Sequence, residues 1–439
     1  MSTTVARGAV AAQKVSNRWL VVVGAVLIQL CLGAIYAWSV FTPYLEDKQG
    51  VFQFSKTQTQ AIFSVGLATF AIVMVLAGRW QAKSGPRIVA LTGGLVLGAG
   101  YLLAGLLKDA LFGHFVNQII FIGLVGGAGI GLGYVCPIAV GIKWFPDKKG
   151  LITGLGVAGF GFGALIWIKL AGSWGHLLDA DKLGVSGVFT LYGAIFAAAV
   201  VIGSIWMVNP PAGYKPAGWN PITTGATASN AESVSLMPRQ MLTRAQFYAI
   251  WVMFIFSAMA GLMVIGNIAL FAKERLVDVS ALSPEAAIAV AGTAMAVFYS
   301  IANGLGRIAW GVISDRVGRK PALIAMCVLQ GIVMLLFFWM GGNQYLLYLG
   351  ATLIGFNFGG NFALFPTMTA DLFGAKNVGL NYGWVFTAYG VGGIVGPIMA
   401  AAIRDANLSW VSAFVIAGVA CLLAAAIGVT LKRPQIEGA

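Results

Sequence analysis

The chain has 439 residues, of which 59% are hydrophobic and 9% charged, and its mean hydropathy is +0.87. This composition excludes a soluble globular protein and predicts an all-α polytopic membrane protein. The net charge of +13 would fit a nucleic-acid-binding protein. However, the Lys and Arg residues are spread through short loops, so no nucleic-acid partner is expected.

Twelve apolar stretches of about 20 residues follow one another, separated by loop signals. The first follows Lys14 and Arg18 and is too long for the apolar part of a signal peptide, so we expect a retained membrane helix. The predicted spans are 19–41, 57–79, 86–107, 116–142, 150–173, 187–208, 246–272, 286–313, 321–341, 344–367, 379–403 and 409–431.

Basic residues are unevenly divided between the two sets of loops. With the N-terminus inside, eighteen of the 27 Lys and Arg residues fall on the cytoplasmic side and seven outside, while Lys169 and Arg307 lie within spans. The positive-inside rule therefore predicts that both termini are cytoplasmic. We expect a multi-pass protein of the cell (inner) membrane whose basic loops meet anionic lipids at the cytoplasmic face.

The longest loop joins six spans to six spans and is rich in Pro, Gly, Thr and Ser. A segment of this kind is typical of a linker rather than of a folded element. We therefore predict a six-helix bundle over residues 1–208, a cytoplasmic linker over 209–245 and a second six-helix bundle over 246–439.

Two short motifs recur in corresponding places of the two halves. The loop 78–87 after the second span resembles the loop 311–320 after the eighth span. Such repetition indicates duplication, and many secondary transporters form their site between two repeated halves. The fifth and eleventh spans open with matching residues at a constant offset, which are Gly150, Leu151, Gly154, Gly161 and Gly163 against Gly379, Leu380, Gly383, Gly390 and Gly392.

Arg307 lies within the eighth predicted span. A guanidinium group keeps its proton, so its insertion costs roughly 2.5 to 3.5 kcal/mol unless something compensates the charge. Tyr299, Asn303 and Arg307 stand at i, i+4 and i+8 and share one helix face, which we expect to look into a polar cavity. No Asp or Glu lies well inside any span. A mobile anion is therefore the candidate counter-ion.

The alternative is that Arg307 snorkels to water at the cytoplasmic boundary. Helical side chains lean toward the N-terminus of their own helix, however, and in the expected topology this helix starts outside. The lean therefore carries the guanidinium toward the membrane midplane.

Enzyme chemistry finds no support in the sequence. No Ser/His/Asp, Cys/His or paired-carboxylate arrangement occurs at membrane depth, and no Gly-rich run follows a strand or precedes a Walker lysine. The four cysteines lie in apolar runs without the spacing of metal ligands, so neither disulfides nor a metal site are expected. The sequence thus predicts no enzyme and no cofactor.

The two Gly-x-x-x-Asp-Arg-type loops, the twelve spans and the central linker resemble the major facilitator superfamily over nearly the whole chain. A narrower resemblance, to the oxalate/formate antiporter family and its bacterial monocarboxylate-transporting relatives, rests on four stretches, which are 36–38, 143–150, 241–247 and 381–383. These resemblances imply the major facilitator fold and a carrier for small carboxylates of the lactate, pyruvate or formate type.

Members of that family hold a substrate carboxylate with an arginine of the eighth span, and Arg307 occupies the matching position. The family's oxalate exchanger adds a lysine in the eleventh span, where this chain has Tyr389. A dianion would keep about one unit of uncompensated charge, worth roughly 4 kcal/mol at about 4 Å and an effective dielectric of about 20. A monoanion is therefore favoured over oxalate. Proton-coupled animal relatives have an aspartate at the position of Asn303, so proton coupling through a carboxylate is not favoured here.

We expect Arg307 to bind the carboxylate bidentately and Asn303 to bond the substrate or the guanidinium. Four tyrosines are candidate walls that offer hydroxyls and apolar faces, although ordinary packing would explain each one alone. They are Tyr36, Tyr134, Tyr299 and Tyr389.

The basic loops supply the candidate gate. Asp315 and Arg319 of the second loop motif are the expected gating residues, whereas Ala82 stands where the first motif usually has its aspartate, so the gate should be asymmetric. We expect a monomer that works by alternating access. An unpaired Arg307 makes the loaded transitions easier than the empty ones, which favours exchange or facilitated uptake.

Three alternatives remain. An oxalate/formate-type anion exchanger would use the same arginine. A multidrug exporter of the same superfamily would more often need an acidic cavity, and a membrane sensor would need a signalling attachment.

Overall fold

The structure, a computed structural model, describes residues 17–107, 113–172, 174–179, 181–211, 213–216, 235–406 and 408–432. Arg7, Lys14, Lys108 and Arg433, which entered the charge count, lie outside these ranges, as does most of the predicted linker. The described residues form no strand and fold into twelve long helical segments, which confirms the predicted all-α membrane fold.

The first six segments run from residue 19 to residue 204. Two of them change helix type along their length, since each contains a tightened or widened turn region (η) between α-helices. They are α1 (Trp19–Leu32) with η1 (Gly33–Ala37) and α2 (Trp38–Leu45); α3 (Lys56–Ser84); α4 (Pro86–Leu106); α5 (His114–Gln118) with η2 (Ile119–Gly126) and α6 (Gly127–Trp144); α7 (Lys149–Ala171); and α8 (Gly184–Ser204).

The last six segments follow a short helix, α10 (Pro238–Met241). They are α11 (Ala245–Ser280); α12 (Pro284–Thr293) with η3 (Ala294–Tyr299) and α13 (Ser300–Val317); α14 (Arg319–Met340); α15 (Gln344–Phe373); α16 (Val378–Asp405); and α17 (Trp410–Thr430).

Local sequence signals define where these helices begin and end. The Ser55 side chain caps α3 in a reciprocal capping box with Gln58, and Asn343 caps the start of α15. Gly318 has a φ of 96°, a conformation that favours glycine, and separates α13 from α14 within a single residue.

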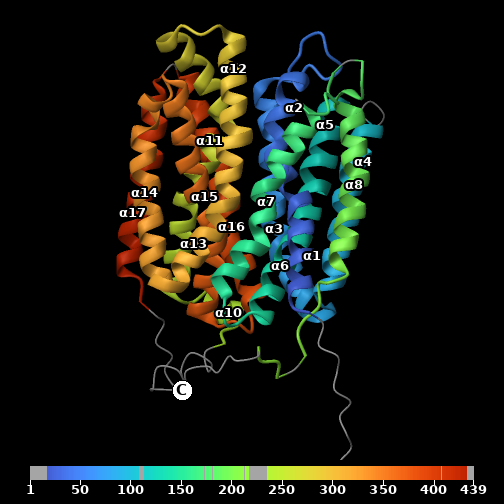
Figure 1. Ribbon diagram of the computed structural model, residues 1–439, viewed down its shortest axis with the longest axis vertical. Coiled ribbons are helices and arrows are strands. Elements are labelled where there is room, and N and C mark those ends of the chain that lie inside the picture. Colours follow the sequence, from blue (N-terminus) through green and yellow to red (C-terminus); the bar gives the residue numbers. More distant parts are fainter. Residues whose placement is uncertain are drawn as a thin grey trace, which may run out of the picture.

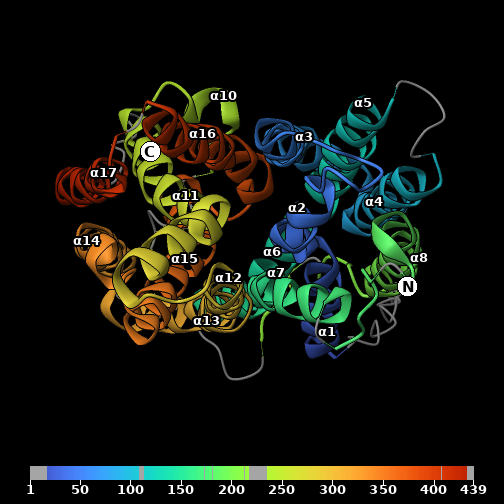
Figure 2. The same ribbon diagram turned by 90° about the horizontal axis from the view of Figure 1, so that it is seen from above.

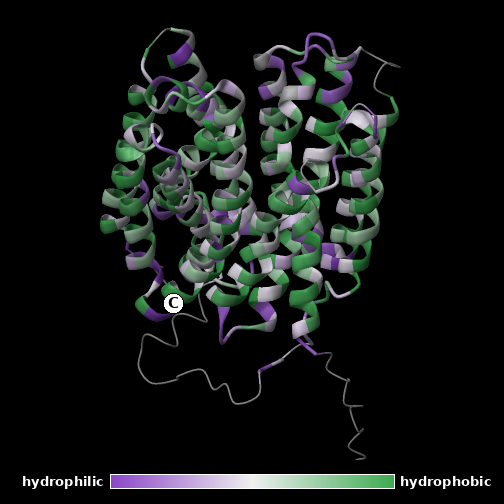
Figure 3. Cartoon of the chain, turned by 45° about the horizontal axis from the view of Figure 1, so that its top comes forward, coloured by the Kyte–Doolittle hydropathy of each residue, from purple (hydrophilic) through white to green (hydrophobic). Residues whose placement is uncertain are grey.

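The helices stand roughly side by side, with α1 beginning and α17 ending at what we call the lower end of the molecule (Figure 1). Seen from above, α1 to α8 form one group and α11 to α17 another (Figure 2). The groups meet along two seams, in which α7 packs against α13 and α3 packs against α16. Apolar residues predominate on the helices, whereas hydrophilic ones gather at their ends (Figure 3).

Eleven of the described segments are long and apolar enough to cross a membrane. Among the twelve, α15 falls outside this set because Asn357, Asn361 and several glycines interrupt its apolar sequence. All residues of α15 from 354 to 370 are nonetheless buried, except Phe356, which is partly exposed. Its polar groups therefore face protein rather than lipid.

Glycines bring both seams to backbone contact at the lower end. A Cβ at Gly78 would meet the carbonyl of Gly379, and a Cβ at Gly150 would meet that of Gly311. Each position therefore accepts only hydrogen in this arrangement. The two groups of helices are closed against each other at this end.

Candidate functional site

Two contacts between helices hold the backbone of α13 at the level of Arg307. A Cβ at Gly154 of α7 would meet the Arg307 carbonyl, and a Cβ at Gly359 of α15 would meet the Asn303 carbonyl. The glycines thus let α7 and α15 approach α13 to backbone distance. Arg307 is thereby enclosed between helices of both groups.

The Arg307 guanidinium is completely buried. Its Nε donates to Asn303 Oδ1 at 2.9 Å, and its Nη1 donates to the Val157 carbonyl of α7 at 3.0 Å. The guanidinium carbon lies 4.0 Å from the Phe362 ring centroid and 5.2 Å from that of Phe160. The side chain leans toward its own helix N-terminus, as expected, and does not snorkel to water.

No carboxylate neutralises this charge within the described part of the chain, where none of the ion pairs includes Arg307. An amide oxygen, a carbonyl oxygen and aromatic faces stabilise a cation only partly. The positive charge is therefore available to an anion.

Three buried hydrogen-bonding atoms near this charge lack a partner among the described residues: Arg307 Nη2, Asn303 Nδ2 and Tyr134 Oη. The Tyr36 and Tyr134 hydroxyls lie close enough to the guanidinium to interact with it electrostatically. Leaving buried donors unpaired costs about 1 to 3 kcal/mol each. A small anion with several acceptor oxygens would satisfy all three.

The four candidate tyrosines are all buried, but they do different things. The hydroxyls of Tyr36 and Tyr389 lie 2.7 Å apart in a hydrogen bond that joins η1 to α16 across the two groups of helices. Tyr299 donates to the Gly261 carbonyl of α11 at 3.3 Å. Tyr134 contacts Phe160 edge to face.

The expectation of a polar cavity around Arg307 is wrong for this structure. Aromatic rings surround the guanidinium, and no part of its surface is exposed.

The sequence also did not point to the Val157 carbonyl, Phe160 or Phe362, because helical periodicity shows which residues share a face but not which helix lies opposite. The one sequence signal for these aromatic neighbours was an arginine within a span that lacks a carboxylate, because aromatic faces can stabilise such a cation.

The expected gating residues meet at the lower end of the α7–α13 seam. Asp315 accepts hydrogen bonds from the backbone N–H groups of Gly150 at 3.1 Å and Leu151 at 2.9 Å. It also forms an ion pair with Arg319. Asp315 thus caps the N-terminus of a helix in the other group, which favours a negative charge there.

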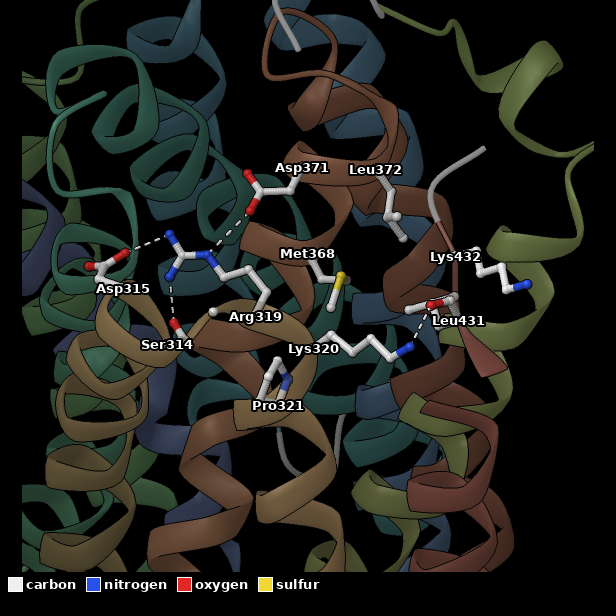
Figure 4. A pocket seen from close by; sticks show the side chains of 11 residues that line it. Ser314, Asp315, Arg319, Lys320, Pro321, Met368, Asp371, Leu372, Leu431 and Lys432 are labelled. Carbon is white, nitrogen blue, oxygen red and sulfur yellow. Dashed lines mark hydrogen bonds and ion pairs between the residues drawn. The ribbon is translucent and has the colours of Figure 1, made fainter. Parts of the chain in front are cut away.

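A second acid, which sequence reasoning did not single out, extends this network. Asp371 of α15 accepts from Arg319 Nε at 3.3 Å and lies 3.9 Å from Lys149 Nζ. Figure 4 shows Arg319 between the two carboxylates, with Ser314 as a third partner. Both acids bonded to Arg319 therefore link the two groups of helices, Asp315 through backbone N–H groups of α7 and Asp371 through Lys149 of the same helix.

At the lower end of the α3–α16 seam, the described residues 78–87 and 376–383 include no Asp or Glu. Ala82 carries no polar group, and the neighbouring Gln81 has a buried Oε1 that lacks a partner among the described residues. Asn381 instead donates to the carbonyl of Leu236, in the chain before α10, at 2.9 Å. The two seams therefore differ at their lower ends, with an acid that bonds across the α7–α13 seam and an alanine in the matching position of the α3–α16 seam.

No group of three or more His, Cys, Asp or Glu side chains within the described ranges is arranged to hold a metal ion.

Comparisons with known proteins bear on this site. The sequence model of the Major Facilitator Superfamily matches residues 25–298 and 279–438. The oxalate:formate antiporter of Oxalobacter formigenes is 26% identical over 94% of this chain and 90% of its own length. The apicoplast pyruvate carrier 1 of Toxoplasma gondii is 25% identical over 84% of this chain and 81% of its own.

A solved structure shows the same fold. The proton:xylose symporter XylE, bound to 6-bromo-6-deoxy-D-glucose, superimposes with a TM-score of 0.63 over 93% of this chain and 94% of its own. At 14% sequence identity this likeness concerns the arrangement of the helices alone.

Proposed function

Because this chain belongs to the major facilitator superfamily, a family of multi-pass membrane transporters, we propose that it carries small monocarboxylates of the lactate, pyruvate or formate type by alternating access. Arg307 binds the carboxylate. The observation that supports this most directly is a fully buried guanidinium whose Nη2 has no partner and which lacks an ion pair among the described residues. Relatives named for oxalate, formate and pyruvate transport agree with an anionic substrate.

The hydrogen-bond directions limit how a carboxylate can approach. Asn303 occupies Nε, and the Val157 carbonyl takes one N–H of Nη1. One N–H of Nη1 and both N–H groups of Nη2 remain at the end of the guanidinium. They can donate to the two oxygens of one carboxylate side by side. Asn303 Nδ2 and Tyr134 Oη are then free to serve a further oxygen, such as a 2-hydroxyl or 2-oxo group.

The aromatic walls favour a short carbon chain. Tyr36, Phe160 and Phe362 stand close to the guanidinium and leave no exposed space beside it. Tyr36, Tyr299 and Tyr389 complete the proposed site as wall residues, while Asp315 and Arg319 act as the gate. Because no space is open in this arrangement, substrate binding requires these rings or their helices to move, and a substituent of one or two carbons requires the smallest movement.

The proposal includes the arrangement in the membrane. The bundles 1–208 and 246–439 rock against each other about the site. The protein lies in the cell (inner) membrane, with the linker 209–245 and both termini in the cytoplasm. The lower end is then cytoplasmic and faces anionic lipids. We propose that one copy of the chain is sufficient for transport.

An oxalate/formate-type exchange is the second candidate, and it is favoured by the likeness to the Oxalobacter formigenes antiporter. The single charge of Arg307 argues against it, because a dianion would keep about one uncompensated unit of charge in a buried site.

Uptake of labelled L-lactate into proteoliposomes tests the proposal. The Arg307→Ala variant should lose uptake. Arg307→Lys should lose roughly 10- to 100-fold in apparent affinity, because the lost charge-assisted bonds are worth about 1.5 to 3 kcal/mol. Arg316→Ala, an exposed arginine of the same helix, is the matched control and should transport normally.

The same vesicles separate the two candidates. Uptake should be stimulated by internal unlabelled formate, and an inward proton gradient should change it little. If lactate does not enter under any condition while internal oxalate drives exchange, the monocarboxylate proposal is wrong and dianion exchange replaces it.

A further inference from the structure

A second cavity lies at the lower end, away from Arg307. Its volume is about 460 Å³, and it opens between the end of α13, the start of α14, the end of α15 and the end of α17. Figure 4 shows Arg319 on one side of it and Lys320 and Lys432 on the other. The proposed transport site does not use this cavity.

The charges that line the cavity do not cancel. Arg319 is paired with both acids of the lining, Asp315 and Asp371. Lys320 and Lys432 have no carboxylate partner among the described residues. An excess of positive charge therefore remains on the α17 side of the cavity.

Backbone contacts fix one of these two charges. Lys320 Nζ donates to the carbonyls of Val429 at 2.7 Å and Leu431 at 2.9 Å, at the C-terminal end of α17. An ammonium group has three N–H donors, so one remains for a ligand. Neutral carbonyls orient the ammonium group without removing its charge.

The start of α14 adds main-chain donors to the same wall. Gly318 precedes this helix of 22 residues and provides no side-chain cap, unlike Ser55, Asn343 and Ser409 at other helix starts. Arg319 and Lys320 are the first-turn residues whose N–H groups can serve an anion, because Pro321 has no N–H and the Ala322 N–H donates to the Gly318 carbonyl at 3.3 Å. The helix dipole favours negative charge at this end. Met368, Leu372 and Leu431 supply apolar surface beside these N–H groups.

We propose that this cavity binds a phosphate group, carried either by a lipid headgroup or by free phosphate. Lys320, Lys432 and the first turn of α14 all line the cavity and can supply donors to a group with several acceptor oxygens. The cavity shares Arg319 with the gate, so the bound group lies beside the ion pairs of Asp315 and Asp371.

The test is the unfolding temperature of the detergent-purified full-length protein at constant ionic strength. One arm adds inorganic phosphate in place of chloride. The other arm adds short-chain phosphatidylglycerol in place of the net-neutral phosphatidylcholine. A bound ligand should raise the unfolding temperature in a saturable way, by on the order of 2 °C at high occupancy.

Variants locate the effect. Lys320→Gln/Lys432→Gln should lose the rise, and Lys432→Gln alone should weaken it without touching a folded contact, because Lys432 is exposed. Lys376→Gln, an exposed lysine at the same end but outside the cavity, should keep it. Arg307→Ala should also keep it, so the outcome does not depend on the carboxylate site.

Each result decides the proposal. A rise with phosphate and with the lipid assigns the site to the phosphate group in general, and a rise with phosphatidylglycerol alone assigns it to a lipid headgroup. No rise in either arm, or an equal rise in wild type and Lys320→Gln/Lys432→Gln, would overturn it.

Discussion

Asn303 orients Arg307 through a neutral amide, and this leaves the positive charge uncompensated. Replacement Asn303→Asp would put a carboxylate about one turn from the guanidinium, where Nε now bonds to the amide oxygen. At about 4 Å and an effective dielectric of about 20, that pair is worth roughly 4 kcal/mol. The added acid should therefore compete with the substrate.

We expect Asn303→Asp to lower the apparent affinity for lactate at least about tenfold at both pH 7.5 and pH 5.5. The ion pair with Arg307 holds the new carboxyl in its charged form, so the competing negative charge persists at both pH values. Asn303→Ser, a neutral control, should lose less affinity. Substrate competition measured at both pH values checks this, and equal affinities for wild type and the acidic variant would contradict it.

Among the described hydrogen bonds, the Tyr389 hydroxyl takes part only in the one with Tyr36. It also lies close enough to Arg307 to interact with it electrostatically. We expect Tyr389→Lys to shift selectivity toward dianions, because a second cation would compensate the second carboxylate. Tyr389→Phe, which removes the hydroxyl pair without adding charge, is the control. Inhibition of lactate uptake by oxalate should rise in the first variant and not in the second; unchanged inhibition in both would show that residue 389 does not face the substrate.

At this scale the sequence was sufficient for the residues on one helix face but not for their partners across helices. Asn303 and Arg307 were paired from their spacing, and the structure places them in a hydrogen bond. The Val157 carbonyl and Phe362 were not foreseen, because a backbone oxygen has no side-chain signal and Phe362 is one of 27 phenylalanines.

The existence of the helices was predictable because membrane spans are long and apolar, whereas the residues at which they end were harder to predict. The seventh span was expected to end at residue 272 and the tenth at 367, whereas α11 continues to Ser280 and α15 to Phe373. Helices continue past the apolar stretch because their backbone hydrogen bonds remain satisfied within the helix in the interfacial region. Glu274 lies in this extension and accepts hydrogen bonds from Arg404 and Trp410.

Helix α7 offers a test of the close seam. A Cβ at Gly154 would meet the Arg307 carbonyl of α13, whereas a Cβ at Gly156, one half-turn away, would meet only the Ala25 methyl group at an ordinary 3.9 Å. We expect Gly154→Ala to destabilise the closed seam by about 1 to 3 kcal/mol and to abolish most transport. Gly156→Ala should be tolerated. Lactate uptake normalised to the amount of folded protein measures both, and equal activity of the two variants would show that the seam is not closed during transport.

The molecule as a whole repeats its seam contacts with one difference at the site. Gly154 lies against the carbonyl of Arg307, and Gly383 lies in the corresponding way against that of Met74. The duplication that the sequence motifs indicated is thus visible in how the helices touch. The counterpart of Arg307 is an uncharged methionine, so a two-fold-related framework carries a single buried cation.

The residues of the proposed gate also differ between the two repeats. Asp315 caps α7 across one seam, and Ala82 stands at the corresponding place before α16. Asp315→Asn keeps an acceptor oxygen but removes the negative charge that Arg319 and the start of α7 stabilise. A charged cap is worth about 0.5 to 2 kcal/mol, so the population open at the lower end should rise roughly two- to thirtyfold.

The reverse change tests the other seam. Ala82→Asp would place a carboxylate near the backbone N–H groups of Gly379 and Leu380, and it should stabilise the closed lower end and slow exchange. Spin labels at two exposed positions on either side of the first seam, Lys148→Cys and Arg316→Cys, report the distance in each background. We expect longer distances with Asp315→Asn and fewer long distances with Ala82→Asp. If Ala82→Asp leaves both the distances and the exchange rate unchanged, the two seams do not open together, and the asymmetry of the gate has no effect on transport.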